Sequence, residues 1–451
     1  MTATVTLVVV SGALRGEEFA FGERDTCVMG RAADCSPRLP NDREHRTISR
    51  HHCLLDINPP DVRVRDFGSR NGTFVNGVKI GQRAEGLTPE EGAGGHYPEH
   101  DLRDGDEIEL GDTVMRVRID VPEPAPGEPP RRRETLELDE PRGARGAGCA
   151  VCGRSTAERL CGACRDDPGI VVRHLLDEAG DDPELAALDG CTLVGELGRG
   201  GMGAVFRARD PQGADLALKV MLPRVAASAA ARRRFLREVE LTGSLRHPNI
   251  ARLHAYGSAD DIFFFTMEYC ADGSIDRFGA GALPLDDAVG HILQALDGLD
   301  HAHRQGVVHR DLSPQNILLH GGVAKLCDFG LAKAFDQAGL SGLTRTGSAA
   351  GKPRFMPRQQ VVNFKNAGPD VDVWSMAASL YWLLTGYTPR DFSVLKDPWQ
   401  IVLQDPAVPV RDRAPGVPKA LAEVVDHALR ERPAIGFSTA ADFREALGKA
   451  L

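Results

Sequence analysis

The chain has 451 residues, of which 42% are hydrophobic and 26% are charged, and its formal net charge is -10. This length exceeds what one hydrophobic core usually organises, so we expect two or three domains. The composition is that of an ordinary globular protein, and an acidic surface argues against general nucleic-acid binding because it repels phosphate backbones. No apolar stretch is long enough to cross a bilayer, and no basic region precedes the first apolar run. The sequence therefore predicts no membrane span and a cytoplasmic protein.

The first block, residues 1–120, alternates short β-type runs with turn signals. The runs are TVTLVVV, HHCLLDI, VRVRDF, GTFVNGVKI, DEIELG and TVMRVRI. Their alternation and β-branching predict an all-β sandwich, interrupted by a loop at EGLTPEEGAGGHYPEHD. Residues 121–147 are rich in proline and charge, which predicts an extended or disordered linker.

Three strings in this block, MGRAAD, ISRHHCLL and GSRNGTFVNG, resemble the marks of the forkhead-associated (FHA) domain. A phosphate on a peptide needs a guanidinium and hydroxyl donors on rigid loop ends. The resemblance implies a phosphothreonine-binding site formed by Arg31, Ser49, Arg50 and Asn71. It also implies that His52 is structural rather than a ligand. Without the other strings, NGTFVNG would indicate only a hairpin.

Residues 148–166 contain two CxxC pairs in the string CAVCGRSTAERLCGAC. Cys149, Cys152, Cys161 and Cys164 can close a tetrahedral site with four thiolate ligands, which suits a structural Zn²⁺. The gap between the pairs is shorter than in most zinc ribbons, so the module resembles a minimal zinc ribbon. A redox dithiol is the alternative, although no thioredoxin-like βαβ pattern surrounds the pairs. We expect a second linker at residues 167–188.

From residue 189 to residue 451, strands come first and long helical periodicities follow. The helical stretches include LDDAVGHILQALDGLDHAHRQ and DVWSMAASLYWLLTG. This order predicts a two-lobed α+β domain with an N-lobe at 189–269 and a C-lobe at 270–451. The string GELGRGGMGAVFRA places Gly198, Gly200, Gly203 and Val205 at GxGxxGxV spacing, where backbone amides can approach phosphate oxygens. Alone, this spacing also marks dinucleotide-binding folds.

The next strings, LALKVM, RRRFLREVELTGSLRHPNI and FFFTMEYCADGS, resemble the ATP-binding part of the protein-kinase family. The resemblance implies that Lys219 holds the α- and β-phosphates of ATP and pairs with Glu238. Glu240 is the alternative partner, on another face of the helix. The resemblance also implies an adenine pocket, whose residues are Ala217, Met267, Glu268 and Cys270.

The strings VVHRDLSPQNILL and AKLCDFGLA resemble the catalytic and metal-binding segments of the same family. The resemblance implies that Asp311 orients the substrate hydroxyl and accepts its proton. Asn316 and Asp328 would hold Mg²⁺ or Mn²⁺, because amide and carboxylate oxygens are hard ligands that suit these ions. Asp372, in DVDVWS, is expected to brace the catalytic loop.

The chain departs from the family pattern near the catalytic loop. Ser313 stands where the family commonly has a lysine that contacts the transferred phosphate, and Lys352, in GKPRFMPRQQ, stands where it commonly has a threonine. We hypothesise a reciprocal swap, in which Lys352 supplies the ammonium and Ser313 the hydroxyl. The alternative is that Lys352 points to solvent and activity is lower. Gln359 and Gly436 replace both members of a family ion pair, which indicates a rewired C-lobe.

Two segments offer hydroxyls for regulatory phosphorylation. The first is LSGLTRTGSAAG, where an added phosphate would pair with Arg310 and order the loop. The alternative is that this segment is a solvated Ser/Thr loop without a regulatory role. The second is the linker string RRRETLELDE, whose Thr135 would dock on the FHA site once phosphorylated. The acceptors in the first segment are Ser341, Thr344, Thr346 and Ser348.

Together the resemblances imply a bacterial-type serine/threonine protein kinase that uses ATP, with protein substrates as partners. Its FHA domain would bind phosphothreonine-containing proteins, or its own phosphorylated linker or activation loop. The alternative is an ATP-binding pseudokinase scaffold that reads phosphothreonine. The enzyme is favoured by retention of the full set, for which a scaffold has no use: Lys219, Glu238, Asp311, Asn316 and Asp328. Ser313 and the altered string GKPRFMPRQQ favour the scaffold.

Overall fold

The structure is a computed structural model. It describes the chain except residues 1–2, 23–24, 34, 85–96, 99, 121–147, 157–159, 201–202, 223–238, 241, 260–261, 280, 282, 330–351, 363–366 and 393–397. None of the described helices has both the length and the apolar composition of a bilayer span.

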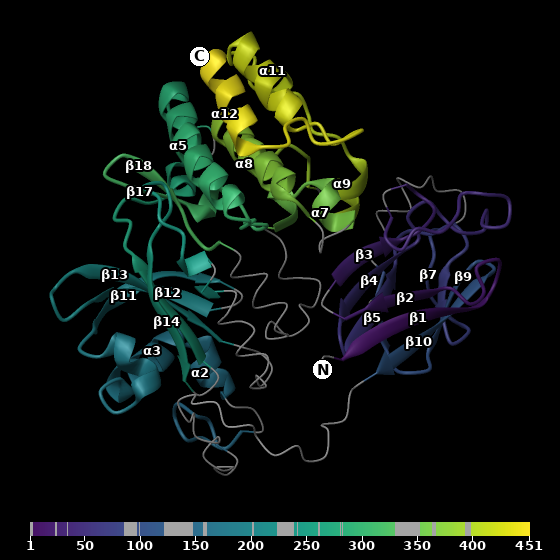
Figure 1. The fold of residues 1–451 in the computed structure, drawn as a ribbon, viewed down its shortest axis with the longest axis horizontal. Coiled ribbons are helices and arrows are strands. Elements are labelled where there is room, and N and C mark those ends of the chain that lie inside the picture. Colours follow the sequence, from purple (N-terminus) through teal and green to yellow (C-terminus); the bar gives the residue numbers. More distant parts are fainter. Residues whose placement is uncertain are drawn as a thin grey trace.

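The N-terminal domain is a β-sandwich of two antiparallel sheets (Figure 1). The first sheet has the order β2-β1-β10-β9-β6-β7 and the second the order β3-β4-β5-β8. The first sheet comprises β1 (Thr4–Ser11), β2 (Glu18–Phe21), β6 (Thr73–Val75), β7 (Val78–Gly81), β9 (Glu107–Leu110) and β10 (Thr113–Asp120). The second comprises β3 (Asp25–Met29), β4 (Cys53–Asn58), β5 (Asp61–Asp66) and β8 (His100–Leu102). The predicted sandwich is confirmed, although the sequence runs did not indicate β2, β3 or β8.

A small helical module follows the cysteine pairs. It contains α2 (Gly162–Asp166), α3 (Pro168–Glu178) and the 3-10 helix η1 (Pro183–Leu188). Helix α3 begins at a proline, which needs no N–H there, and the Asp167 carboxylate accepts a hydrogen bond from Gly169 N at 3.1 Å. Its Val171, Val172 and Leu175 lie in one buried cluster with the N-lobe sheet. The range 167–188, expected to be a linker, therefore contains α3 and η1, packed on the N-lobe.

The N-lobe is a five-stranded antiparallel sheet with the order β11-β12-β13-β15-β14. Its strands are β11 (Thr192–Gly200), β12 (Gly203–Arg209), β13 (Asp215–Met221), β14 (Leu253–Ala259) and β15 (Ile262–Glu268). The C-lobe has a small sheet, β16 (Gly273–Ser274), β17 (Ile317–His320) and β18 (Val323–Leu326), with the 3-10 helices η2 (Ile275–Phe278), η3 (Pro314–Asn316) and η4 (Lys352–Phe355). Its helices are α5 (Leu285–Arg304), α7 (Arg358–Val362), α8 (Pro369–Thr385), α9 (Pro398–Gln404), α10 (Val410–Arg413), α11 (Lys419–Ala428) and α12 (Ala440–Lys449).

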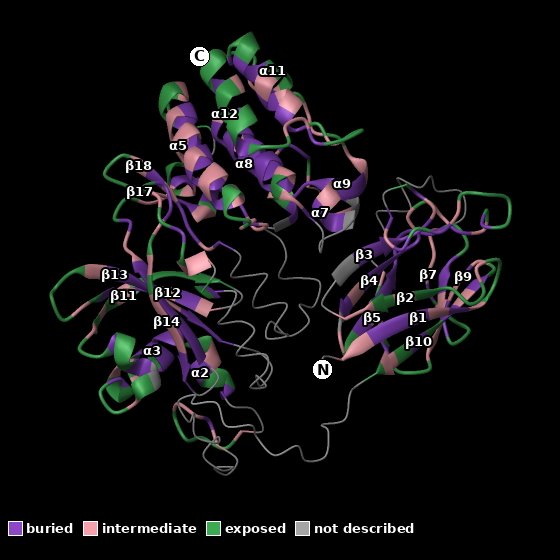
Figure 2. Cartoon of the chain, in the orientation of Figure 1, coloured by how far each residue is buried: buried purple, intermediate pink, exposed green. Residues whose placement is uncertain are grey.

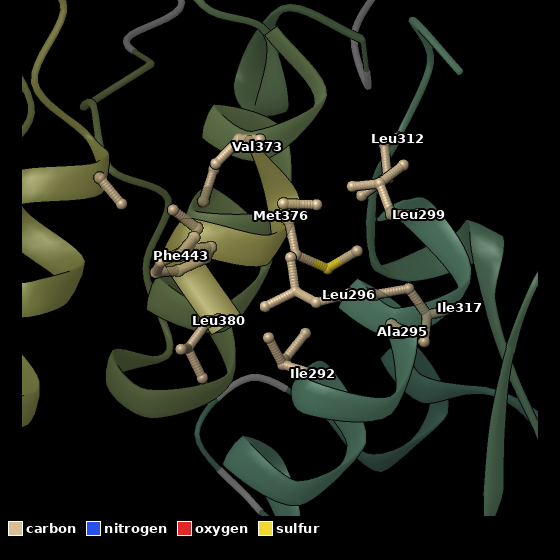
Figure 3. Packing of buried hydrophobic residues seen from close by; sticks show 14 of the residues in the cluster. Ile292, Ala295, Leu296, Leu299, Leu312, Ile317, Val373, Met376, Leu380 and Phe443 are labelled. Carbon is tan, nitrogen blue, oxygen red and sulfur yellow. The ribbon is translucent and has the colours of Figure 1, made fainter. Parts of the chain in front are cut away.

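The core of the C-lobe lies between α5, α8 and α12, and it supports the segment that carries the predicted catalytic residues. Leu296 of α5 packs with Met376 of α8 and Phe443 of α12, and Leu312 and Ile317 join the same cluster (Figure 3). Because Leu312 and Ile317 lie within and directly after HRDLSPQN, burial of their side chains fixes this segment against α5. Helices α5 and α8 confirm the two long helical periodicities.

Candidate functional site

The glycine-rich string forms the β11–β12 hairpin. Gly198 pairs with Val205, and Gly200 pairs with Gly203 at the end of the ladder. Gly203 has a φ of +152°, and a Cβ placed there would lie 1.9 Å from Val220 O. Only glycine fits this close approach of β12 to β13, so at least one glycine of the motif is required by packing.

Lys219 lies on β13, next to the hairpin, because it pairs with Val205 across the sheet. Its Nζ lies 2.7 Å from Asp328 Oδ2. Burial alone would lower the pKa of the Lys219 ammonium, but the carboxylates of Asp328 and Asp311 outweigh burial and raise this pKa above its ordinary value. The Lys219–Asp328 ion pair therefore joins β13 of the N-lobe to the segment that follows β18 in the C-lobe.

Among the described residues, the ion-pair partner of Lys219 is Asp328 rather than the alternative glutamate, Glu240. Glu238 lies outside the described residues. Glu240 lies near Tyr256 on β14: burial raises the pKa of the Tyr256 hydroxyl, and the Glu240 carboxylate raises it further. The Lys219–Glu238 pair stays a prediction.

The residues expected around adenine lie together at the end of β15. Ala217 pairs with Met267 across the sheet, and both side chains are buried. Glu268 Oε1 lies 3.2 Å from Lys325 Nζ, an ion pair that fixes this connection between the lobes. Cys270 is buried, and burial raises the pKa of its thiol to about 11, so it stays protonated at neutral pH.

Asp372, at the N-terminal end of α8, braces the catalytic segment as expected. Its carboxylate accepts hydrogen bonds from the backbone N–H groups of His309 and Arg310, both at 2.7 Å. His303 Nε2 lies 2.9 Å from the same carboxylate, and His309 Nε2 lies 2.8 Å from Cys327 O. The catalytic loop is therefore tied to the residue directly before Asp328.

Two residues at this site have unusual backbone conformations. Arg310 has a φ of 62° and Asp328 a φ of 63°, in the left-handed region that non-glycine residues rarely adopt. Such conformations persist only where the surrounding contacts impose them. Asp328 adopts this conformation where its carboxylate pairs with the Lys219 ammonium, and Arg310 adopts it directly before Asp311.

The hydroxyl of Ser313 has a defined partner. Its Oγ donates a hydrogen bond to Asn316 Oδ1 at 2.7 Å, and Asn316 O accepts one from Cys327 N at 3.0 Å. The serine therefore orients the amide oxygen that is predicted to bind the metal. The structure does not describe the side chain of Lys352, so the reciprocal swap of Lys352 and Ser313 stays a prediction.

The C-lobe substitutions at Gln359 and Gly436 belong to a different polar arrangement. Gln359 Nε2 donates to Glu431 O at 2.8 Å, and Glu431 forms a buried ion pair with Arg390. A Cβ at Gly436 would lie 1.8 Å from His427 O, so no side chain fits there. The sequence indicated rewiring, but nothing in it identified Arg390 and Glu431 as the replacement pair.

The four predicted phosphothreonine-site residues lie on neighbouring loops of the β-sandwich. Arg31 donates from Nε to Ile48 O at 2.5 Å and from Nη1 to Asn41. Ser49 Oγ accepts from Arg70 N at 2.9 Å, and Asn71 Nδ2 donates to Thr47 O at 2.6 Å. Arg50 and Asn71 are exposed. The arrangement places cations and polar groups at one end of the domain, which suits a phosphate.

His52 is structural, as expected. It is fully buried, its Nδ1 accepts from Ser49 N at 2.9 Å, and its Nε2 lies 3.1 Å from Gly72 O. The imidazole therefore holds the loop of Ser49 against the loop of Asn71. Burial lowers the pKa of His52, which keeps the ring neutral and able to accept the Ser49 hydrogen bond.

The four cysteines of the CxxC pairs converge. Their sulfur atoms all lie within 4.8 Å of one another, and Cys149, Cys161 and Cys164 are buried. Sulfurs bound to one tetrahedral Zn²⁺ are expected about 3.8 Å apart, from a Zn–S distance near 2.3 Å. Burial would raise the pKa of the Cys149 thiol, but backbone amides of Cys161, Cys152 and Val151 lower it to about 6. Burial and the neighbouring sulfurs raise the pKa of the Cys164 thiol far above its ordinary value, so the fit to an ion rests on the clustering of the four sulfurs. The residues present therefore fit a structural Zn²⁺.

One contact at the nucleotide side of the site was not expected from the sequence. Arg199, inside the glycine-rich string, donates from Nη1 to Asp166 O at the end of α2. Its guanidinium also pairs with Glu196 at 2.9 Å. In the sequence, Arg199 is only a charged residue between two glycines. Nothing near it indicates a contact with Asp166, which lies 33 positions earlier in the chain.

Two family models match the chain: the protein kinase domain at residues 191–427 and the FHA domain at residues 27–90. PknJ, a serine/threonine-protein kinase of Mycobacterium tuberculosis, is 34% identical over 267 residues, which cover 56% of this chain and 44% of PknJ. The DNA damage-responsive serine/threonine-protein kinase RqkA of Deinococcus radiodurans is 36% identical over 257 residues, which cover 53% of this chain and 36% of RqkA. The matches thus span less than half the length of these curated relatives.

Solved structures match the chain at lower identity. Rad53 bound to AMP-PNP is 19% identical with a TM-score of 0.48, and the match covers 98% of this chain and 100% of that one. The PknI kinase domain of Mycobacterium tuberculosis is 28% identical with a TM-score of 0.44, and the match covers 58% of this chain and 96% of that domain. Because the kinase model matches more than half of its residues, this chain belongs to the protein kinase family, and it also carries an FHA domain.

Proposed function

We propose that this chain is a serine/threonine protein kinase that transfers the γ-phosphate of ATP to hydroxyl groups of proteins. The observation that carries the proposal is the ion pair between Lys219 Nζ and Asp328 Oδ2 at 2.7 Å, with the Asp311 carboxylate near enough to help raise the pKa of the Lys219 ammonium. A chain that only binds nucleotide gains nothing from a carboxylate placed to accept a proton. A protein kinase domain uses ATP and a divalent cation, and the donor set fits both.

Each residue has a role in the proposed reaction. Lys219 would hold the α- and β-phosphates. Asn316 and Asp328 would hold Mg²⁺ or Mn²⁺, which would offset the charge on the phosphate oxygens. The substrate hydroxyl oxygen bonds to the γ-phosphorus as the bond between that phosphorus and the β,γ-bridging oxygen breaks, so ADP leaves. The hydroxyl proton passes to Asp311. The Ser313 hydroxyl donates to the Asn316 amide oxygen and so fixes the orientation of a group that would serve as a metal ligand.

The second candidate function is a pseudokinase scaffold, which the replacement of the catalytic-loop lysine by Ser313 favours. The Ser313–Asn316 hydrogen bond weighs against it, because the serine supports a metal ligand rather than removing one. The metal ions and the positioning of the substrate account for most of the rate of phosphoryl transfer, so one missing lysine lowers this rate without abolishing it.

The FHA domain recruits or regulates through phosphothreonine, which Arg31, Ser49, Arg50 and Asn71 bind in this proposal. The partners are phosphothreonine-containing proteins or phosphorylated sites in the chain itself. The internal candidates are Thr135, Ser341, Thr344, Thr346 and Ser348, all outside the described residues.

Zinc is part of the proposal as a structural ion held by the four clustered cysteines. It stabilises a module that is too small to fold around a core of its own. None of the cysteines, all of which are described, forms a disulfide. Together with the use of ATP, this supports the proposed cytoplasmic location.

Intact-mass spectrometry tests the proposed activity. The purified chain is dephosphorylated, incubated with ATP and Mg²⁺, and compared with an Asp311→Asn variant, which keeps the size of the side chain and removes the proton acceptor. We expect mass increases of one phosphate each in the unmodified chain alone. If neither protein gains phosphate while both bind ATP, other protein substrates are tried with the same pair, and their failure would favour the scaffold. Mapping of the phosphates tests Thr135 and the activation-segment residues.

A further inference from the structure

The second sheet of the FHA domain has an apolar outer face. Along β3 and β4, Cys27, Met29, Cys53 and Leu55 point into the sandwich core, so the alternate residues point outward. In a sandwich whose outer face meets water these alternate residues are usually polar. Here two of them are apolar and form a cross-strand pair, Val28 with Leu54, and they are 0% and 7% exposed.

The C-lobe of the same chain covers this face. Helix α7 contacts β3, and α7 and α9 lie next to the sandwich in Figure 1. Figure 2 shows buried residues on β4 of the FHA domain and on α9 of the C-lobe. One buried cluster contains residues of both domains: Val28, Ala32, Cys35, Leu54 and Phe67 from the FHA domain, and Met356, Val361, Val402 and Leu403 from the C-lobe.

A polar contact accompanies the apolar one. Arg358 of α7 is only 6% exposed, and its Nη2 lies 3.2 Å from His51 Nε2 in the FHA domain. Its Nη1 donates to Leu403 O at 2.5 Å, and its backbone N donates to Glu431 Oε1 at 2.6 Å. The guanidinium therefore joins α7, α9 and the FHA domain at one point.

The FHA side of this contact shares its loops with the predicted phosphothreonine site. His51 follows Ser49 and Arg50, and the backbone O of Arg50 accepts hydrogen bonds from Ala32 N at 2.9 Å and from Cys35 Sγ at 3.2 Å. Ala32 and Cys35 belong to the buried interdomain cluster. The same short segments thus form the interface and carry the site residues Arg31, Ser49 and Arg50.

The kinase side of the contact reaches the catalytic loop within one helical turn. Gln360, two residues after Arg358, is buried, and its Nε2 donates to Arg310 O at 2.6 Å. Arg310 directly precedes Asp311 and has the strained φ described above. Helix α7 has only five residues, so contacts on either side must hold it in place.

We propose that the FHA domain docks on α7 and α9 of its own C-lobe and, through Gln360, holds the catalytic loop in its active conformation. The domain is then a positioning element for Asp311 as well as a phosphothreonine reader. Residues 121–147 tether the two domains, and a tether of this length gives an effective concentration in the millimolar range, so a modest interface stays closed. The kinetic part of the proposal depends on the proposed kinase activity, whereas its structural part does not.

The test uses the full chain with charged substitutions on each side of the interface. Leu54→Glu and Val402→Glu each place a carboxylate in the apolar contact. Val78→Glu is the matched control, because Val78 is an apolar FHA residue that is 65% exposed. Gln360→Leu removes the link to Arg310 and leaves the docking surface unchanged. Circular dichroism confirms that each variant is folded.

Three measurements are made on each protein: the radius of gyration by small-angle X-ray scattering, hydrogen exchange of residues 307–316, and kcat for autophosphorylation. We expect a larger radius in Leu54→Glu and Val402→Glu only. We expect exchange at least tenfold faster and a kcat at least tenfold lower in these two variants and in Gln360→Leu, with Val78→Glu like the unmodified chain.

Two results would overturn the proposal. A Leu54→Glu chain as compact as the unmodified one would show that the apolar contact does not hold the domains together. An extended Leu54→Glu chain with unchanged exchange in residues 307–316 would show that docking does not support the catalytic loop. If the unmodified chain transferred no phosphate, the proposed function would be refuted but the docking proposal would not. Scattering and hydrogen exchange would still show whether the FHA domain docks on the C-lobe.

Discussion

Arg199 Nη1, in the glycine-rich hairpin, donates a hydrogen bond to Asp166 O at 2.5 Å. Asp166 ends helix α2, two residues after Cys164 of the cysteine cluster. A second feature connects the cluster to the N-lobe: Cys149, Cys161 and Cys164 lie in one buried group with Phe206 and Leu218 of the sheet. The cysteine module is therefore attached to the N-lobe both through its core and at the nucleotide-binding hairpin.

Removal of zinc is expected to weaken ATP binding through this contact. A zinc-selective chelator, with Mg²⁺ in excess, releases the four thiolates, so α2 loses its anchor and the Arg199 hydrogen bond is lost. We expect KM for ATP to rise several-fold with a smaller change in kcat. Arg199→Ala should raise KM similarly and make it insensitive to the chelator, whereas Arg209→Ala, at the far end of β12, should behave as the unmodified chain. A chelator effect of the same size in Arg199→Ala would contradict this route.

Under the swap hypothesis, Ser313 supplies the hydroxyl and Lys352 the ammonium near the transferred phosphate, so substitution of either residue is expected to lower kcat. Ser313→Ala removes one hydrogen bond to Asn316, and the loss of about 1 kcal/mol predicts a kcat several-fold lower. Under the swap hypothesis, Lys352→Met and Lys352→Thr each lower kcat by about 10- to 100-fold, because a cation near the transferred phosphate is lost. The double change Ser313→Lys with Lys352→Thr should then recover most of the activity. Unchanged turnover in both single Lys352 variants would exclude the swap.

Much of this architecture could be predicted from the sequence, because glycine spacing, helical periodicity and strand alternation are local signals. They indicated the sandwich, the N-lobe hairpin, α5 and α8, whereas the brace at Asp372 was expected only from the resemblance to the protein-kinase family. Contacts between distant segments have no such signal. Nothing near Arg390 indicates Glu431, and the outward-facing Val28 and Leu54 are understood only when α7 and α9 cover them. The range 167–188 was expected to be a linker because it is too short to form a core of its own. Its helix α3 is stabilised by apolar contacts with the N-lobe sheet, which the local sequence does not indicate.

Asp372→Asn is expected to disturb the catalytic loop more than its small change in size suggests. The carboxylate accepts from both His309 N and Arg310 N, and an asparagine has one oxygen for these two donors. One buried N–H then faces an NH₂ group, at a cost of about 1–3 kcal/mol. We expect a lower midpoint of urea unfolding and a kcat at least tenfold lower, with KM for ATP nearly unchanged, since Lys219 is not touched. Asp370→Asn, in the first turn of the same helix, is the control. A normal kcat in Asp372→Asn would show that the loop needs no carboxylate brace.

Docking of the FHA domain is expected to weaken in acid through His51. Burial, together with the positive charges of Arg50 and Arg432, lowers the pKa of this imidazole to about 4, and Arg358 faces it from α7. When the domains separate, His51 loses its burial against the C-lobe and the charge of Arg432, so its pKa rises toward the ordinary value near 6.5, while Arg50 of the same domain still lowers it. The undocked form then binds a proton that the docked form does not, so docking is strongest above pH 6.5 and weakens as the pH falls from 6.5 toward 4.

The size of this effect can be measured in a Leu54→Ala background, where a smaller apolar contact populates both forms. Energy transfer between labels on the two domains reports the docked fraction. We expect the ratio of docked to undocked chains to fall by up to about tenfold between pH 7.5 and pH 5.5, because the pKa of His51 is higher in the undocked form. His51→Gln keeps an oxygen that can accept from Arg358 and does not titrate, so its ratio should stay nearly constant. An equal fall in both proteins would assign the pH dependence to another group.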